Sequence, residues 1–404
     1  MSNNPVSIVL VGVGGYGNTY VNALLDAKDK TLFRIAGVVD PFATGCRRLE
    51  ELKALGIPFF DDLGAFYAEN SAELAVISSP ISLHAPQTCK ALENGSNVLC
   101  EKPLGATIQE ATAMREARDR AKRFVAIGYQ WSFNEAILAL KRDILAGRFG
   151  APKRLRTLVL WPRSEAYYKR NSWAAALKDA RGNWVLDSPV NNATAHYLHN
   201  MFYVLGPAIN RSAVPRYVTA ELYRANRIEN YDTGACRVLT EDGVEILFYS
   251  CHAVSDSRGP EFVYEFENGV VTYSALEKTI QAAFASGETV EYGDPQRNVP
   301  QKLWDSVGAV RGKNDIMCGV ETASSQTLCM NGMQESASGI TEFPASLVSI
   351  EGEGDTKLTV VEGLADTLAH CYETGCLPAE TDAPWATAGR VLDLRGYSSF
   401  PSFS

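Results

Sequence analysis

Residues 6–17 read VSIVLVGVGGYG, an apolar run that breaks directly into closely spaced glycines. A helical pattern follows, and a second apolar run ends at Asp40. This order predicts a βαβ unit whose helix N-terminus binds a pyrophosphate. In such a unit Gly12 permits the tight turn, Gly14 lets backbone N–H groups approach the ligand, and Gly17 lets the helix pack closely on the sheet. The spacing alone is a weak signal, but the flanking strand, the helix and the acid agree with it.

The acid at the end of the second strand indicates which dinucleotide binds. A carboxylate at Asp40 would accept hydrogen bonds from the ribose hydroxyls and would repel a 2′-phosphate. We therefore predict NAD as the cofactor, with Gly15 and Tyr16 of the glycine turn among its contacts. Arg47 and Arg48 follow shortly afterwards and keep NADP as the alternative.

Composition restricts the class of protein. At 404 residues the chain exceeds what one hydrophobic core usually supports, so we expect two domains. Apolar residues make up 46% and charged residues 21%, which is typical of globular proteins. The net charge of −9 comes without a basic stripe, which argues against nucleic acid or an anionic membrane as a partner and favours a small neutral substrate.

The N-terminal segment and the cysteines indicate the compartment. Residues 1–5 contain neither a positive segment nor an apolar stretch typical of a signal peptide, and no apolar run approaches the ~20 residues of a transmembrane helix. Nine cysteines are scattered without a C-x-x-C pair, so we expect reduced thiols and neither a disulfide framework nor a zinc site. We therefore expect a cytoplasmic protein.

Strands and helices alternate through the first third of the chain. We expect strands at 35–39, 58–60, 74–78, 97–100 and 124–128, and helices at 44–55, 63–69, 84–93 and 108–122. Alternation of this length predicts a parallel, doubly wound sheet. The predicted Rossmann domain covers residues 1–129.

The pattern changes beyond residue 130. A long amphipathic helix at 134–150 comes first, helices return near 188–205 and 361–372, and residues 395–404 show no clear pattern. Between them strands dominate, at 154–160, 217–223, 235–239, 244–249, 262–267 and 269–274. We expect residues 130–404 to form an α+β domain with a large, open, mostly antiparallel sheet.

One predicted strand ends in a chemically distinctive turn. Residues 97–100 run into Glu101-Lys102-Pro103, at the carboxyl end of a Rossmann strand, where the ligands of open α/β sheets collect. A lysine fixed there by a proline can hydrogen-bond a substrate hydroxyl, and partial desolvation would let it exchange a proton near neutral pH. The alternative is a surface turn that carries a charged pair.

Several short motifs occur together in this chain. The most specific is Glu-Lys-Pro after the strand VLC, and the others are Gly12–Gly17, Asp40, Ser79-Pro80 with His84, Gly128-Tyr129-Gln130 and Gly147-Arg148-Phe149-Gly150. Together they resemble the Gfo/Idh/MocA oxidoreductases, the group of glucose–fructose oxidoreductase and inositol 2-dehydrogenase. The resemblance covers the Rossmann part closely and the second part more loosely.

The resemblance implies a fold, a reaction and several site residues. Members of the family transfer hydride to or from a carbinol of a sugar, inositol or related polyol. Their open sheet often forms the oligomer interface, so a homodimer or homotetramer is expected. Lys102 would be the catalytic lysine beside the nicotinamide, and Glu101 would contact the ribose or the neighbouring backbone. The other residues implied near the cofactor are Ser79, Pro80, His84 and Gln130. For His84, a packing or helix-capping role is the alternative.

The family's second signature is an Asp and a His spaced i, i+4 on one helix face. Counting back from Gly206, which matches the glycine that ends this helix, puts the His at His196 and the acid at Asn192. This is a departure, because an amide can orient a substrate hydroxyl but cannot take a proton. Acid–base work then rests on His196 and Lys102, and Asp187 lies too far along the chain to be assumed a substitute.

Two other residues near these motifs are candidates for substrate binding. His199 follows His196 at i, i+3, but no carboxylate or cysteine joins the pair at ligand spacing, so we expect no metal. His199 is predicted to contact substrate, with a buried core histidine as the alternative. Tyr129 is a further predicted substrate contact, and His199 or Tyr129 is the alternative base if His196 is not the reacting histidine.

Aromatic and arginine side chains gather just before this helix, at Trp161, Arg163, Tyr167, Tyr168, Arg170 and Trp173. Aromatic faces stack on the C–H faces of sugars while Arg and Tyr bond their hydroxyls, so the mixture fits a carbohydrate pocket. An oligomer interface, which also collects such residues, is the alternative.

These observations predict reversible hydride transfer between NAD and a secondary alcohol of a sugar, sugar derivative or cyclic polyol. His196 would remove the hydroxyl proton, Lys102 would polarise the same oxygen and Asn192 would fix the ring, although His196 and Lys102 could exchange roles. The alternative, which resembles the chemistry of some related proteins, is glycoside cleavage through transient oxidation of the sugar. A cofactor-sensing regulatory protein is disfavoured because Lys102 is present.

Overall fold

The computed structural model describes residues 4–402. Residues 1–3 of the N-terminal segment and residues 403–404 of the tail, both considered above, lie outside the described residues. The chain forms two compact units. Unit 1 contains the chain up to Gly105 together with Gln109–Asn134 and Asn298–Ser324, and unit 2 contains Ala106–Ile108, Glu135–Arg297 and the chain from Ser325 onward.

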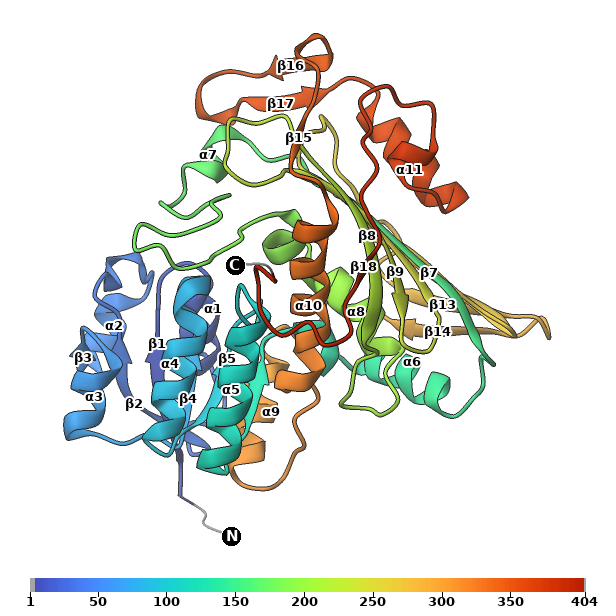
Figure 1. The fold of residues 1–404 in the computed structure, drawn as a ribbon. Coiled ribbons are helices and arrows are strands. Elements are labelled where there is room, and N and C mark those ends of the chain that lie inside the picture. Colours follow the sequence, from blue (N-terminus) through green and yellow to red (C-terminus); the bar gives the residue numbers. More distant parts are fainter. Residues whose placement is uncertain (1–3, 403–404) are drawn as a thin grey trace. The chain divides into compact units, whose positions relative to one another are not determined.

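Unit 1 is built on a parallel sheet, which within the described residues has six strands in the order β3-β2-β1-β4-β5-β6 (Figure 1). The strands are apolar and mostly buried, as expected for a parallel sheet covered on both faces. Their bounds are β1 Val6–Val11, β2 Phe33–Val39, β3 Phe59–Phe60, β4 Leu74–Ile77, β5 Asn97–Cys100 and β6 Val125–Ile127. The order reverses between β1 and β4, where Rossmann folds bind dinucleotides. The predicted doubly wound fold is confirmed.

The helices of this unit are α1 Gly17–Leu25, α2 Leu49–Ala54, α3 Leu63–Glu69, α4 Ile81–Glu93, α5 Ile108–Ala121 and α9 Gln301–Val310. The helix expected at 44–55 is shorter, because a 3₁₀ turn at Ala43–Gly45 precedes α2. α9, orange in Figure 1, comes from the second half of the chain and packs against β4 and β5. Unit 1 is therefore completed by a segment far from the rest of it in sequence.

Unit 2 is built on a large open sheet in the order β14-β13-β12-β11-β7-β10-β9-β8-β15, with β18 also paired to β8. Most neighbours are antiparallel, whereas β7 pairs with β10 and β8 pairs with β15 in parallel. The bounds are β7 Pro152–Leu160, β8 Pro215–Arg224, β9 Thr233–Thr240, β10 Glu245–Cys251, β11 Arg258–Phe266, β12 Gly269–Ser274, β13 Ile280–Phe284, β14 Thr289–Gly293, β15 Thr341–Glu342 and β18 Leu392–Asp393; a separate hairpin joins β16 Val348–Glu351 to β17 Leu358–Val361. The predicted open, mostly antiparallel sheet is confirmed.

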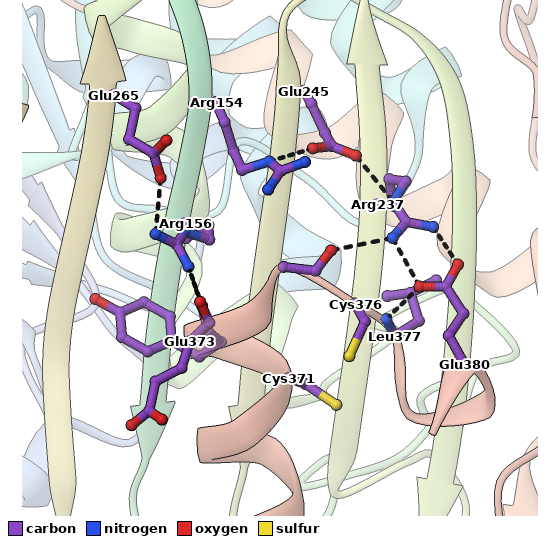
Figure 2. Close-up of polar contacts among 12 residues, drawn as sticks. Arg154, Arg156, Arg237, Glu245, Glu265, Cys371, Glu373, Cys376, Leu377 and Glu380 are labelled. Carbon is purple, nitrogen blue, oxygen red and sulfur yellow. Dashed lines mark hydrogen bonds and ion pairs between the residues drawn. The ribbon is translucent and has the colours of Figure 1, made fainter. Parts of the chain in front are cut away.

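Further helices are α6 Glu135–Leu145, α7 Glu165–Tyr168, α8 Ala195–Val204 and α11 Leu364–Thr374 in unit 2, and α10 Val320–Ser336, which begins in unit 1 and continues into unit 2. α11 packs on β7 and β10 over a cluster of buried apolar side chains. Figure 2 shows arginines of the sheet at the C-terminal end of α11, where Arg156 donates to the Glu373 carbonyl. Arg156 also donates to the Tyr372 carbonyl at 2.7 Å, and Arg237 donates to the Gly375 carbonyl at 3.2 Å. Cations at a helix C-terminus complement its dipole, so these contacts stabilise the docked helix.

Two further observations concern the whole described chain. All nine cysteines are free thiols, and most of them are buried. None of the helices in residues 4–402 is both long enough and apolar enough to cross a membrane.

Candidate functional site

The glycine turn of unit 1 follows β1 and leads into α1. Gly12 has a positive φ of 78°, and a Cβ there would lie 3.0 Å from the Ser78 carbonyl. A Cβ on Gly17 would lie 2.3 Å from the Gly12 carbonyl oxygen, so α1 can approach the sheet only with glycine there. Around Gly15, also at positive φ, a Cβ would meet no atom within 4 Å, so the turn borders open space. The turn therefore has the conformation and the room that a pyrophosphate requires.

Asp40 directly follows β2 and lies beside this turn. Its Oδ2 accepts from the Val13 N–H at 2.9 Å and its Oδ1 from the Phe42 N–H at 2.8 Å, which fixes the carboxylate. The Arg48 guanidinium is bound to two other carboxylates at 2.6 Å each, whereas the Arg47 side chain is exposed. A fixed carboxylate of this kind can accept hydrogen bonds from a ribose hydroxyl, so these residues fit a dinucleotide.

His84 lies in α4 and joins two turns at the carboxyl edge of the sheet. Its Nδ1 is 2.7 Å from the Pro103 carbonyl oxygen and its Nε2 is 2.9 Å from that of Ser79, while Pro80 precedes the first residue of α4. Burial lowers the pKa of His84, and the two carbonyl contacts oppose that shift. The ring thus holds the turn that carries Lys102 against the turn after β4.

Glu101 and Lys102 follow β5. Glu101 is buried, and its Oε1 accepts from the Tyr20 hydroxyl at 2.5 Å and from the Lys302 ammonium. Its Oε2 lies 3.2 Å from the Lys102 backbone nitrogen, which donates to it. A Cβ on Gly128 would lie 2.7 Å from Glu101 Oε1, so the glycine is needed for this packing. Lys102 itself is half-buried at the ligand-binding edge of the sheet.

Tyr129 and Gln130 follow β6 at the same edge. Tyr129 is completely buried, and burial holds the pKa of its hydroxyl well above the usual value. Such a phenol stays protonated at neutral pH, which makes it a poor general base. Gln130 Oε1 is 3.4 Å from the hydroxyl of Tyr16, which connects it to the glycine turn.

Asn192 and His196 lie in unit 2 at the junction of two kinds of helix. Asn192 belongs to a π-helical turn, Pro189–Ala193, and His196 to the first turn of α8. The single helix expected at 188–205 is therefore interrupted at Thr194. Such π-turns are frequent at functional sites because they redirect side chains. Both side chains are partly exposed, so both can meet a ligand.

Asp187 lies directly against Asn192, although its distance along the chain did not predict this contact. Its Oδ1 accepts from Asn192 Nδ2 at 2.7 Å, and its Oδ2 accepts from the Ala175 N–H at 2.6 Å and from Arg170 at 3.1 Å. Asp187 is only 2% exposed. A buried carboxylate thus forms a direct hydrogen bond with Asn192, the residue at which the chain has an amide where an acid was expected.

The arginine and aromatic residues form a ladder of stacked side chains. The Arg163 guanidinium is 4.9 Å from the Tyr167 ring centre, and Arg170 is 3.8 Å from the same ring. Trp161 packs edge-on against Tyr197, the neighbour of His196, at 5.6 Å, and Trp173 lies 5.5 Å from Arg170. Since Arg170 also binds Asp187, the ladder is continuous with Asn192. The predicted substrate residues at 161–173 and at 192–196 are therefore parts of one contact network.

Two other histidines of unit 2 are buried. His199 stacks on Tyr203 at 5.8 Å, and burial, with nearby Lys141, lowers its pKa to about 3. His252, which sequence reasoning missed, follows β10; its Nδ1 is 3.5 Å from the Tyr168 hydroxyl, and burial holds its pKa well below the usual value. Both are neutral at physiological pH. His252 follows β10, which pairs in parallel with β7, the strand that leads to Trp161, and this pairing exists only in the folded chain.

No group of three His, Cys, Asp or Glu side chains in residues 4–402 is arranged to hold a metal ion. The structure instead places the glycine turn, Asp40 and Lys102 at the carboxyl edge of the sheet of unit 1, and in unit 2 it joins Asn192, Asp187 and Arg170 to the arginine–aromatic ladder.

Comparison with known proteins agrees with this reading of unit 1. Residues 6–129 match the family model of the Gfo/Idh/MocA oxidoreductases, described as an NAD-binding Rossmann fold. The rhizopine catabolism protein MocA of Rhizobium meliloti is 33% identical over 141 residues, which cover 35% of this chain and 43% of that protein. Inositol 2-dehydrogenase of Rubrobacter xylanophilus is 28% identical over 151 residues, covering 36% of this chain and 42% of that protein. The chain thus spans less than half the length of these relatives.

The similarity of fold extends further than the similarity of sequence. The WlbA dehydrogenase of Bordetella pertussis, solved in complex with NADH and UDP-GlcNAcA, superposes with a TM-score of 0.70 over 83% of this chain and 97% of that chain. The two are 19% identical, so this comparison shows a shared fold.

Proposed function

Because the chain belongs to the Gfo/Idh/MocA oxidoreductase family through residues 6–129, we propose that it transfers hydride between NAD and a secondary alcohol of a sugar, sugar derivative or cyclic polyol. The observation that supports this proposal most strongly is the Glu101-Lys102 turn, fixed by His84 at the carboxyl edge of a dinucleotide-binding sheet. NAD is preferred over NADP because the fixed Asp40 carboxylate would repel a 2′-phosphate.

When NAD is bound, its nicotinamide supplies the hydride acceptor. Residues of this chain transfer the proton of the substrate hydroxyl. In oxidation, the carbinol carbon loses hydride, its hydroxyl loses a proton, and a carbonyl forms. We assign the proton transfer to His196 and the polarisation of the hydroxyl oxygen to Lys102, two roles that could be exchanged. Asn192, held by Asp187, orients a ring hydroxyl, and the ladder around Tyr167 binds the sugar face.

A substrate screen tests the proposal. The purified chain is incubated with NAD and a panel of sugars, inositols and aryl glycosides, while the absorbance of reduced nicotinamide and the release of aglycone are followed together. The proposal expects reduced nicotinamide in proportion to one substrate class, and loss of that signal in Lys102→Ala. Aglycone release without accumulation of reduced nicotinamide would instead support glycoside cleavage through transient oxidation. No signal with any alcohol, with either NAD or NADP, would contradict both.

A further inference from the structure

Lys302 is a buried lysine whose ammonium contacts three segments of unit 1. It lies near the start of α9, and its side chain is 1% exposed. Its Nζ donates to the Glu101 carboxylate, to the Tyr16 hydroxyl at 3.0 Å and to the Gly128 carbonyl at 3.0 Å. An ammonium has three N–H donors, and each has an acceptor here. The site is therefore fully hydrogen-bonded despite its burial.

The three acceptors all follow carboxyl ends of strands. Tyr16 belongs to the glycine turn after β1, Glu101 follows β5 and Gly128 follows β6. Ligands of open α/β sheets bind at this edge. Burial alone would lower the pKa of Lys302, but Glu101 and Tyr16 outweigh it and raise the pKa, so the ammonium stays charged. The charged Lys302 ammonium thus connects the glycine turn with the turn that carries Glu101 and Lys102 and with the turn that leads to Tyr129.

Contact with Lys302 also determines how Tyr16 can act. Because Nζ donates to the Tyr16 oxygen, the phenol's own hydrogen is directed elsewhere, and the hydroxyl lies 3.4 Å from Gln130 Oε1. The Tyr16 ring also packs over the ammonium, 4.6 Å from its centre. Tyr16 is nevertheless 38% exposed, so part of it is available to a ligand in the glycine turn. Its orientation depends on a residue from a distant part of the chain.

We propose that Lys302 is a positioning residue for the dinucleotide, which holds Tyr16 and the Glu101 turn in the arrangement that receives the cofactor. This inference rests on the cofactor-binding part of the proposed function and is independent of the substrate. A purely structural ion pair would behave differently, because its loss could be compensated by neutralising both partners.

The test is a titration of the full chain with NADH, followed by calorimetry without any sugar. Lys302→Met should weaken NADH binding about tenfold or more, because the turns lose their common donor. Lys313→Met, an exposed lysine of the same segment, is the matched control and should bind normally. The double variant E101Q/K302M removes both charges, so it should fold more stably than Lys302→Met yet still bind NADH about tenfold more weakly than the unmodified chain.

Tyr16→Phe shows whether Lys302 acts through the phenol. The substitution should weaken binding in the unmodified chain but have less than about a twofold effect in the Lys302→Met background, because the two changes remove the same arrangement. Normal binding by Lys302→Met or by E101Q/K302M would overturn the inference while leaving the proposed function intact. Additive effects of the Tyr16 and Lys302 changes would also overturn it. If the unmodified chain bound neither NADH nor NADPH, the proposed function would fail as well.

Discussion

Replacing Asn192 with Asp would put a second carboxylate beside the buried Asp187. The new carboxylate would lie where Asn192 Nδ2 is now, 2.7 Å from Asp187 Oδ1. Two unit charges at that distance repel by about 6 kcal/mol at an effective dielectric constant of about 20, which corresponds to about 4 pKa units. Arg170, at 3.1 Å from Asp187, offsets part of this repulsion. The folded Asn192→Asp variant should therefore retain one shared proton near neutral pH.

In the folded variant the pKa of the carboxyl pair at residues 187 and 192 is raised. The stability that this pair contributes is therefore fully present below the unfolded-state pKa of about 3.9 and is lost as pH rises through the folded-state pKa. Urea unfolding of Asn192→Asp, compared with the unmodified chain, should show a deficit that grows by up to about 4 kcal/mol between about pH 5 and about pH 8. The swapped variant D187N/N192D keeps one amide and one carboxylate, so its pH dependence should match the unmodified chain.

Parallel pH profiles for Asn192→Asp and the unmodified chain would mean that Asp187 and residue 192 do not share a hydrogen bond. A swapped variant as sensitive to pH as the single one would exclude the shared hydrogen bond as well. The assay needs no substrate, so its result does not depend on the proposed function.

Other consequences can be measured separately. Asp40→Ser should reduce the preference for NAD over NADP by roughly tenfold, about 1.4 kcal/mol, in binding titrations with both cofactors, and an unmodified chain without preference would contradict the role of Asp40. Lys102→Ala should lower kcat by about a hundredfold while NADH still binds; parallel loss of binding would make it a cofactor residue. His196→Asn should lower kcat about as much and remove the ionisation of the general base from the pH–rate profile, and an unchanged profile would exclude it as the base. Burial raises the pKa of Glu221 on β8 to about 7, so the folded state loses about 3 kcal/mol as pH rises through that value; Glu221→Gln should raise the melting temperature at about pH 8 more than at about pH 5, and an equal shift at both would contradict this.

Local patterns were sufficient to predict the glycine turn and its acid. Gly12, Gly17 and Asp40 are set by the backbone over short distances, and the structure gives Gly12 its positive φ and Asp40 its bond to the turn. The six-stranded sheet follows in the same way, because each strand and helix carries its own periodicity.

The remaining contacts depend on chain segments that meet only in the folded state. Lys302 lies about two hundred residues beyond its partner Glu101, and no pattern in α9 marks it as a buried ammonium. Asp187 reaches Asn192 because a π-helical turn, which has no reliable sequence signal, places the chain there. The prediction from sequence spacing assumed one regular helix. For that reason it did not count Asp187 as a substitute for the acid missing at Asn192.

The proposed reaction moves hydride from a carbinol carbon to NAD. Its most direct measurement uses the substrate found in the screen, deuterated at the oxidised carbon, followed by mass spectrometry of the cofactor and the product. We predict that the deuterium appears in the reduced nicotinamide and that a carbonyl product accumulates in equal amount. Deuterium that stays in, or returns to, a cleaved sugar product, with no net reduced nicotinamide, would contradict it.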